Sequence, residues 1–281
     1  VNLSASPYTF KKLELRHKVS SFAAQYLQVP LIYVNQIGAN DNLIFDGNSF
    51  ILDKHGSKIK QLKSFSEDLS SWEIGQTKPE KNKFKNSEMS SIFDALVLGV
   101  KDYAKKCGFK TALIGLSGGI DSALVSAIAT AALGSDNIFC ISMPSKWSSS
   151  HSKSDAKDLA RRLKINFNSI PIKNLMTSFE ESFIQTIDFE MAEITNQNIQ
   201  SRIRGTLLMA LANQENHLLL STGNKSELAV GYCTLYGDMN GGLSVIGDLY
   251  KTNVFKLCNW LDSEESINHR KLYNFNTTEN I

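Results

Sequence analysis

Residues 112–133 read ALIGLSGGIDSALVSAIATAAL, which is an apolar run, a glycine-containing turn and a second apolar run. The first run, Ala112–Leu116, has the length of a buried strand, and the second, Ala123–Leu133, is rich in helix-forming residues. A strand, a glycine turn and a helix in this order bring backbone N–H groups and a helix N-terminus to one point. The sequence therefore predicts an anion-binding loop at 117–122, suited above all to phosphate.

The side chains of this loop refine the prediction. Gly118 and Gly119 lack a Cβ, so the backbone can turn sharply and approach a ligand closely. Ser117 and Ser122 add hydroxyl donors, whereas the carboxylate of Asp121 would repel phosphate unless Mg²⁺ lies between them. The structural alternative is an ordinary N-capped helix after a tight turn, because Ser and Asp are common caps. The lysine and the spacing of a Walker A loop are absent from this stretch.

The chain after residue 90 alternates between strand patterns and helix patterns. Helices are expected at 91–106, 123–133, 154–163, 175–187 and 198–213, and strands at 111–116, 137–143, 167–172 and 217–221. This alternation predicts an α/β fold, with a parallel sheet and helices on both faces. Ligands bind such sheets beyond the carboxyl ends of the strands, so the loops at 117–122, 144–146 and 222–224 are expected to converge on one crevice.

The first ninety residues have a different pattern. A helix is expected at 10–29, where the apolar positions are Phe10, Leu13, Val19, Phe22, Ala23, Tyr26 and Leu27. A strand is expected at 31–34, and two or three more between Leu43 and Gln61, separated at the turn dipeptides Asp46-Gly47 and His55-Gly56. Residues 70–90 are polar and charged and predict a linker. We therefore expect the boundaries 1–69, 70–90 and 91–281.

The composition excludes several classes of protein. With 281 residues, 42% hydrophobic and 21% charged, the chain is typical of a soluble globular protein with one large or two modest domains. A net charge of +2 favours neither nucleic acid nor an anionic membrane as a partner, and no apolar run is long enough for a transmembrane helix. The four cysteines are scattered, without a C-x-x-C pair, which fits a reducing cytoplasm. Cys140 lies in a strand pattern and is expected in the core.

Three further stretches extend the phosphate-loop pattern. They are TNQNIQSRIR at 195–204, TGNKSELAVGYCTLYGDM at 222–239 and IGDLYKTNV at 246–254. Together with the hexapeptide at 117–122, they resemble the ATP-pyrophosphatase-type domain of NAD synthetases over about 91–261. The resemblance implies an adenine nucleotide alpha hydrolase-like fold, ATP and Mg²⁺, and nicotinic acid adenine dinucleotide as substrate. It also implies a homo-oligomer of at least two subunits.

The resemblance assigns roles to individual residues. The site for ATP and pyrophosphate would comprise Leu116, Ser117, Gly118, Gly119, Ile120, Asp121, Ser122, Arg204, Thr222 and Lys251. Asn198, Arg202, Glu227 and Asp238 would contact the dinucleotide substrate. Asp121 and Glu227 would bind the metal, and Asp121 and Lys251 are the expected catalytic residues.

Simpler roles remain open for several of these residues. Glu227 fits a residue favoured by the helix dipole in a first helical turn, Lys251 a solvated surface lysine, and Asp238 a turn residue. Arg202 and Arg204 lie two apart on a predicted helix, so they are expected to point to different faces. Asn198 precedes Arg202 by four residues and is expected to share its face.

The N-terminal segment carries a second resemblance, to the last part of a nitrilase-type glutaminase domain with an α+β sandwich fold. It rests on NLSASPY at 2–8, YVNQIG at 33–38 and FDGNSF at 45–50. In the family a cysteine that precedes the first of these motifs hydrolyses glutamine, and the ammonia passes to the synthetase site. Here that motif opens the chain, and a segment of the family pattern is also missing after Ile281. We therefore expect a fragment, incomplete at both ends, that uses free ammonia but not glutamine.

The function predicted from the sequence is ATP-dependent amidation of nicotinic acid adenine dinucleotide, a ligase reaction that forms a C–N bond. In the full-length protein the ammonia would come from glutamine. Another amidating ligase with the same loop, similar to a GMP synthetase, is the first alternative, although the stretches at 222–227 and 236–239 favour an NAD synthetase. A non-catalytic nucleotide-binding fragment is the second.

Overall fold

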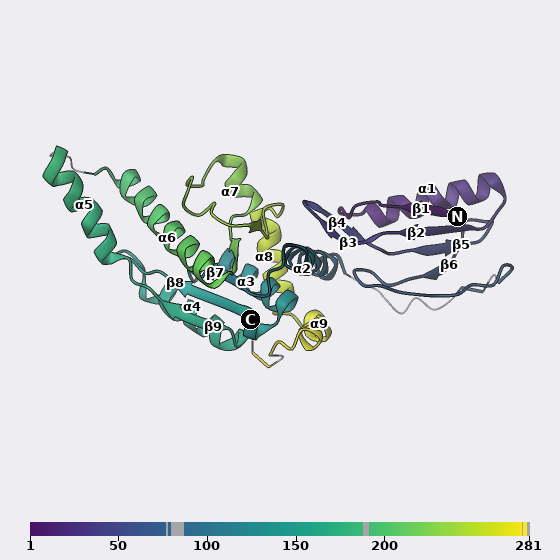
Figure 1. The fold of residues 1–281 in the computed structure, drawn as a ribbon. Coiled ribbons are helices and arrows are strands. Elements are labelled where there is room, and N and C mark those ends of the chain that lie inside the picture. The colour runs from purple at the N-terminus through teal and green to yellow at the C-terminus, as the bar shows by residue number, and fades with distance from the viewer. Residues whose placement is uncertain (77, 80–86, 188–190, 277, 280–281) are drawn as a thin grey trace. The chain divides into compact units, whose positions relative to one another are not determined.

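The computed structural model describes residues 1–76, 78–79, 87–187, 191–276 and 278–279 (Figure 1). The chain divides into two compact units, Val1–Tyr103 and Ala104–Ile281. Helix α2 (Glu88–Cys107) contains the boundary and begins three residues before the helix expected at 91–106. Residues 77 and 80–86 of the predicted linker lie outside the described residues.

The N-terminal unit is built on a four-stranded sheet in the order β1-β2-β5-β6. Its strands are β1 (Asn2–Ser4), β2 (Leu31–Asn35), β5 (Phe50–Leu52) and β6 (Lys58–Gln61). β1 pairs with β2 in parallel and the other pairs are antiparallel. A separate antiparallel hairpin consists of β3 (Ile37–Asn40) and β4 (Leu43–Asp46). Three strands therefore lie between Leu43 and Gln61, and the two predicted turn dipeptides separate them.

Helix α1 (Lys12–Leu27) packs on β2 and β5 through a side that the apolar pattern did not indicate. Its buried residues are Arg16, Ser20 and Ala24, whereas Val19, Phe22, Tyr26 and Leu27 are exposed. Small side chains at 20 and 24 let the helix approach the sheet closely, and the guanidinium of Arg16 bonds to Asp46. The helix was predicted correctly, but most of its apolar residues do not lie in the core.

The C-terminal unit is an α/β structure, as predicted, with a five-stranded parallel sheet in the order β11-β10-β7-β8-β9. The strands are β7 (Ala112–Gly115), β8 (Ile138–Ser142), β9 (Asn166–Ser169), β10 (Leu218–Ser221) and β11 (Leu243–Ser244). From β7 the chain adds strands first on one side and then on the other. The order therefore reverses between β7 and β10, and this switch point is where ligands bind open α/β sheets.

Helices cover both faces of this sheet (Figure 1). Sheet residues Leu113, Ile141 and Leu219 form a core with α5 (Lys173–Ile187) and α6 (Glu193–Glu215). On the opposite face Cys140 contacts Ser126 of α3 (Ile120–Leu133), and α3 packs against α4 (Ser150–Leu163) and α8 (Lys251–Leu261). The shorter helices are η1 (Ser135–Asn137), α7 (Lys225–Val230), η2 (Glu264–Ser266) and α9 (Ile267–Leu272).

Local capping explains one difference between the predicted and the observed bounds. α4 begins at Ser150, earlier than the expected 154, because the side chain of Ser149 accepts the N–H of Ser152 and caps the helix. All four cysteines are free thiols, and Cys140 is buried as expected. Within the described residues we find no helix with the length and apolar character that crossing a membrane requires.

Candidate active site

Two neighbouring cavities, of about 350 and about 390 Å³, lie at the carboxyl ends of β7 and β10. Ser117, Ser221, Thr222 and Asp238 line both of them. Met143 and Pro144, which follow β8, line the first cavity. Each of the three loops expected to converge therefore contributes a lining residue to it. The site therefore lies at the point where the strand order reverses.

The loop that follows β7 is held by its own serines. Ser117 Oγ lies 3.1 Å from Ser122 Oγ and accepts the N–H of Gly119 at 3.1 Å, and Ser122 Oγ donates to the Gly119 carbonyl at 2.9 Å. Gly118 has φ of 84°, and a Cβ there would lie 2.2 Å from the carbonyl oxygen of Ser152, so only glycine fits. No side chain caps α3 at Gly119, which differs from the N-capped alternative and leaves first-turn N–H groups for an anion.

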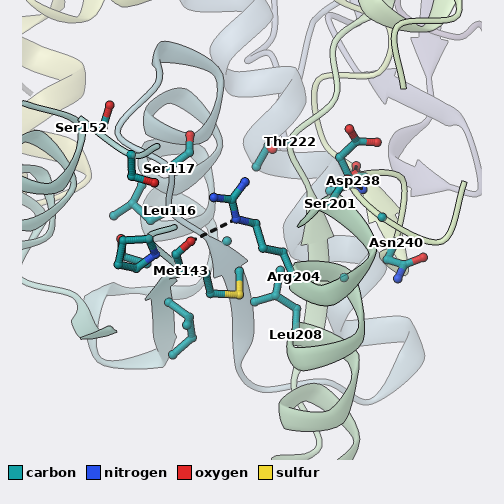
Figure 2. A pocket seen from close by; sticks show the side chains of 18 of the residues that line it. Leu116, Ser117, Met143, Ser152, Ser201, Arg204, Leu208, Thr222, Asp238 and Asn240 are labelled. Carbon is teal, nitrogen blue, oxygen red and sulfur yellow. Dashed lines mark hydrogen bonds between the residues drawn. The ribbon is translucent and has the colours of Figure 1, made fainter. Parts of the chain in front are cut away.

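Arg204 brings a positive charge into the first cavity from α6. Its Nε donates to the Met143 carbonyl at 3.0 Å and its Nη2 to Gln200 Oε1 at 3.0 Å. Figure 2 shows the guanidinium between Ser117 and Thr222. Burial lowers the pKa of the Arg204 guanidinium. The side chain nevertheless stays charged at neutral pH, because the ordinary pKa of arginine is very high. Arg204 thus brings into this cavity a positive charge held by two hydrogen bonds, and Lys153 also lines the cavity.

The second cavity contains both predicted metal ligands, Asp121 and Glu227. Asp121 Oδ2 pairs with the ammonium of Lys251, and Asp121 Oδ1 accepts the Asn224 amide at 3.1 Å. Asn224 Oδ1 in turn accepts the N–H of Glu227 at 3.0 Å, while its own N–H donates to Glu227 Oε2 at 3.0 Å. This capping box bears out the simpler role of Glu227 in the first turn of α7, and the same side chain also faces the cavity.

Lys251 is more than a solvated surface lysine, because it begins α8 and its ammonium forms an ion pair with the carboxylate of Asp121. The neighbouring thiol of Cys258, also on α8, is a poor nucleophile, since burial and then Asp262 and Asp121 raise its pKa to about 12. Lys251 is thus connected to this cavity through its ion pair with Asp121.

Arg202 and Arg204 point in different directions, as their spacing predicts. Arg202 Nε donates to the Leu235 carbonyl at 3.2 Å, and Asn198 Oδ1 accepts the Thr234 hydroxyl at 3.0 Å, so these two share a face and bind the same loop. Neither is among the described residues that line the two cavities. In this structure they hold the loop that carries Asp238, and they do not enter the crevice.

The 234–240 loop fits closely against α6. Ser201 Oγ accepts the N–H of Asp238 at 3.0 Å, and Asp238 Oδ1 accepts the N–H of Thr234 at 2.8 Å. A Cβ on Gly205 would lie 2.7 Å from the Gly237 carbonyl oxygen, so the absence of a side chain at 205 allows this contact. Asp238 thus has the turn role considered above, and it also lines both cavities.

The structure brings together most of the predicted site. Leu116, Ser117, Asp121, Ser122, Arg204, Thr222, Glu227 and Asp238 line one cavity or both. Gly118, Gly119 and Ile120 form the turn between them, and Lys251 reaches the site through Asp121. The sequence prediction placed Asn224 in a converging loop without a role of its own, and it omitted Ser152 and Asn240. The role of Asn224 could have been found, since an Asn three residues before a Glu is a capping-box pattern.

The donor set suits a hard divalent cation. Among the described residues no group of three or more His, Cys, Asp and Glu side chains could hold a metal ion by itself. Asp121 and Glu227 offer two carboxylates beside a phosphate-type loop, and Mg²⁺ is typically bound by one or two carboxylates, waters and the substrate's phosphates. The residues present therefore fit Mg²⁺ that arrives with a nucleotide.

The sheet, its switch-point crevice and the loop at 117–122 define an α/β nucleotide-binding fold of the adenine nucleotide alpha hydrolase-like type. The chain belongs to the NAD synthase family, whose sequence model matches residues 92–272. It is 52% identical over 272 residues to a glutamine-dependent NAD(+) synthetase from Synechocystis, covering 95% of this chain and 49% of that protein. The chain thus spans about half the length of the curated relatives it matches.

Solved structures agree with this assignment. A glutamine-dependent NAD⁺ synthetase from Acinetobacter baumannii, in complex with adenosine diphosphate, aligns with a TM-score of 0.88 at 40% identity, over 94% of this chain and 52% of that one. An NH3-dependent NAD synthetase from Campylobacter jejuni aligns with a TM-score of 0.58 at 30% identity, over 66% of this chain and 78% of that one. The first match runs through both units, so the N-terminal unit also has its counterpart in this family.

Proposed function

We propose that the C-terminal unit catalyses the ATP-dependent amidation of nicotinic acid adenine dinucleotide to NAD, releasing AMP and pyrophosphate. One observation carries the proposal: the Ser117–Ser122 loop and the Thr222–Glu227 segment meet in one crevice at the sheet's switch point. The family assignment and the adenosine diphosphate complex of the A. baumannii relative support a nucleotide in that crevice.

The chemistry requires two steps, because a carboxylate does not react with ammonia in water. An oxygen of the nicotinate carboxylate attacks the α-phosphorus of ATP, and pyrophosphate leaves. Ammonia then attacks the acyl carbon, and AMP leaves with that carboxylate oxygen. Negative charge develops on the leaving pyrophosphate in the first step and on the leaving AMP in the second, so fixed donors and cations should supply most of the catalysis.

The loop at 117–122 would hold the departing pyrophosphate with the backbone at Gly118 and Gly119, the uncapped N–H groups of the first turn of α3 and the hydroxyls of Ser117 and Ser122. Arg204 would offset phosphate charge in the first cavity. Lys251 would move from Asp121 to phosphate oxygens when the nucleotide binds. Leu116, Ile120 and Thr222 would shape the ATP pocket, and Asp238 would contact the dinucleotide.

Mg²⁺, held by Asp121 and Glu227, would screen the phosphates from Asp121 and neutralise the charge that develops on the leaving pyrophosphate. Asn198 and Arg202 are proposed to contact the dinucleotide and also to position the loop that carries Asp238. In this structure the ammonium of Lys251 pairs with the carboxylate of Asp121 and compensates its charge.

We assign residues 1–69 to the C-terminal part of a nitrilase-like glutaminase domain, 70–90 to a linker and 91–281 to the synthetase domain. The relatives named glutamine-dependent align with both units, which supports ammonia derived from glutamine in a longer protein. We further propose a cytoplasmic location, which the free thiols support. We also propose a homo-oligomer of at least two subunits, as the family resemblance implies.

ATP–pyrophosphate exchange tests the proposal. Labelled pyrophosphate should enter ATP only when nicotinic acid adenine dinucleotide is present, because the first step is reversible and needs the carboxylate. Exchange with xanthosine monophosphate in its place would show a ligase of the GMP-synthetase type. Absence of exchange with either compound would show that the crevice adenylates neither the nicotinate carboxylate nor the carbonyl oxygen of xanthosine monophosphate, and would refute the proposal.

A further inference from the structure

Asn224 is a fully buried polar residue that connects the two carboxylates of the second cavity. Its exposed fraction is 0%, and it lies three residues after Ser221, the last residue of β10. Its side-chain amide donates to Asp121 Oδ1, a residue 103 positions away in the chain, and its side-chain oxygen accepts the N–H of Glu227. One side chain therefore fixes both the N-terminal turn of α3 and that of α7.

The amide group is required in this position. A buried residue that donates to a carboxylate and accepts from a backbone N–H must carry one donor and one acceptor on the same short side chain. Asparagine does so, whereas aspartate has only acceptors at neutral pH, and the hydroxyl of serine is too short to span both partners. N-capping alone would be served equally well by Ser, Thr or Asp.

The contacts leave both carboxylates able to bind a further ligand. Asp121 uses one lone pair of Oδ1 for Asn224 and one of Oδ2 for Lys251, and each oxygen has a second. Glu227 uses Oε2 for the Asn224 N–H, and its Oε1 makes no hydrogen bond to another described residue. Asn224 thus orients two carboxylates toward one cavity without occupying their remaining acceptor sites.

We propose that Asn224 is a positioning residue that sets the orientation of Asp121 and Glu227 for a divalent cation bound with a nucleotide. Residues that orient metal ligands contribute about 10–100-fold in metal affinity or activity. The inference rests on the proposed function for the nature of the ligand, a nucleotide with its cation. It does not depend on which carboxylate the protein adenylates.

The test is binding of Mn²⁺, followed by the electron paramagnetic resonance signal of the free ion, to the full chain with the uncleavable analogue α,β-methylene-ATP. Asn224→Ser keeps a helix cap and loses the donor to Asp121. We expect its Kd for Mn²⁺ to rise about 10–100-fold over wild type. Asn224→Thr, a second cap residue that suits the extended backbone at 224, should give the same result if the serine variant is unstable.

The matched control is Asn137→Ala, which removes another asparagine contact to α3, the 2.8 Å bond from Asn137 to the Leu133 carbonyl at the opposite end of the helix. It should lower the Tm and leave Mn²⁺ binding unchanged. If Asn224→Ser and Asn224→Thr bind Mn²⁺ as tightly as wild type while the Tm falls, Asn224 is only a helix cap and the proposal is wrong. Absence of Mn²⁺ binding by the wild type would also overturn it.

The outcome separates this inference from the proposed function. Mn²⁺ binding that depends on Asn224, in a chain that fails to exchange pyrophosphate with nicotinic acid adenine dinucleotide, would refute the proposed substrate and retain the positioning role. Normal pyrophosphate exchange, together with Mn²⁺ binding that does not depend on Asn224, would support the proposed substrate and refute the positioning role.

Discussion

Each unit of the molecule contains a pair between an aspartate and a basic side chain, and the two pairs differ in what surrounds them. Arg16 and Asp46 of the N-terminal unit have side chains only 4% and 2% exposed. Lys251 and Asp121 of the C-terminal unit are 36% and 18% exposed, and Asp121 lines a cavity. The same charge pairing is enclosed by protein in one unit and open to a ligand in the other.

The partners of each aspartate show why the roles differ. Asp46 accepts two bonds from Arg16, at 2.8 and 3.0 Å, and a third from Asn48 at 2.7 Å. The second Nη of Arg16 donates to the carbonyls of Ser6 and Pro7. A charge satisfied in this way ties the start of the chain to α1 and β4. Asp121 keeps acceptor sites toward the cavity, so its charge can serve a ligand.

Arg16→Ala should give the largest effect, because it leaves the buried Asp46 charge without its partner. We expect a loss of about 3–5 kcal/mol in the free energy of unfolding, measured by urea denaturation with circular dichroism. Lys18→Ala, on the exposed side of the same helix, should change it by less than about 0.5 kcal/mol. Equal effects of the two variants would mean that the Arg16 pair does not hold the N-terminal unit together.

Asp121→Asn should give the largest effect on catalysis and a small one on stability. The amide keeps the volume and removes the charge, so pyrophosphate exchange should fall by about 10²-fold or more at saturating Mg²⁺. Asp136→Asn, at an exposed position after α3, serves as the control and should exchange at the wild-type rate. Near-normal exchange by Asp121→Asn would show that the charge of Asp121 is not needed for catalysis, so that its role would not differ from the structural role of Asp46.

Gly205→Ala tests the loop that carries Asp238. The added methyl group would meet the carbonyls of Tyr236 and Gly237, and we expect a cost of about 1–3 kcal/mol in stability from overpacking. The displaced loop should also raise the KM for the dinucleotide more than the KM for ATP. A change confined to stability, with both KM values unaltered, would make this loop a structural element only.

Glu227→Gln should have the smallest effect on stability, because Gln also completes a capping box. We expect a change of less than about 0.5 kcal/mol in the free energy of unfolding, together with a higher Mg²⁺ concentration for half-maximal exchange. A titration of exchange rate against Mg²⁺ provides the measurement. An unchanged Mg²⁺ requirement would leave Glu227 with its capping role alone.

The sequence was sufficient to predict what depends on local pattern. The strand, turn and helix around 117–122 follow from an apolar run, two glycines and helix-forming residues, and the alternation after residue 90 predicted the parallel sheet. Residues at strand ends could be placed in one crevice because parallel strands end at the same edge of a sheet.

Contacts between distant segments could not be predicted in this way. The Lys251–Asp121 pair joins residues 130 positions apart, and the Asn224 amide reaches Asp121 across 103 positions. Nor did periodicity reveal that α1 buries Arg16 and exposes Phe22, because it identifies a helix and its apolar residues without saying what each face meets. The use of Asn198 and Arg202 as loop contacts likewise depends on where the 234–240 loop lies.

We propose that the crevice at the ends of β7 and β10 transfers AMP to the nicotinate carboxylate. This proposal is tested most directly with nicotinic acid adenine dinucleotide that carries oxygen-18 in that carboxylate, incubated with the chain, ATP, Mg²⁺ and ammonium. We expect AMP with one oxygen-18 atom by mass spectrometry, because the carboxylate oxygen stays on the α-phosphorus when ammonia displaces AMP from the acyl carbon. Oxygen-18 in orthophosphate, with ADP as the nucleotide product, would contradict it.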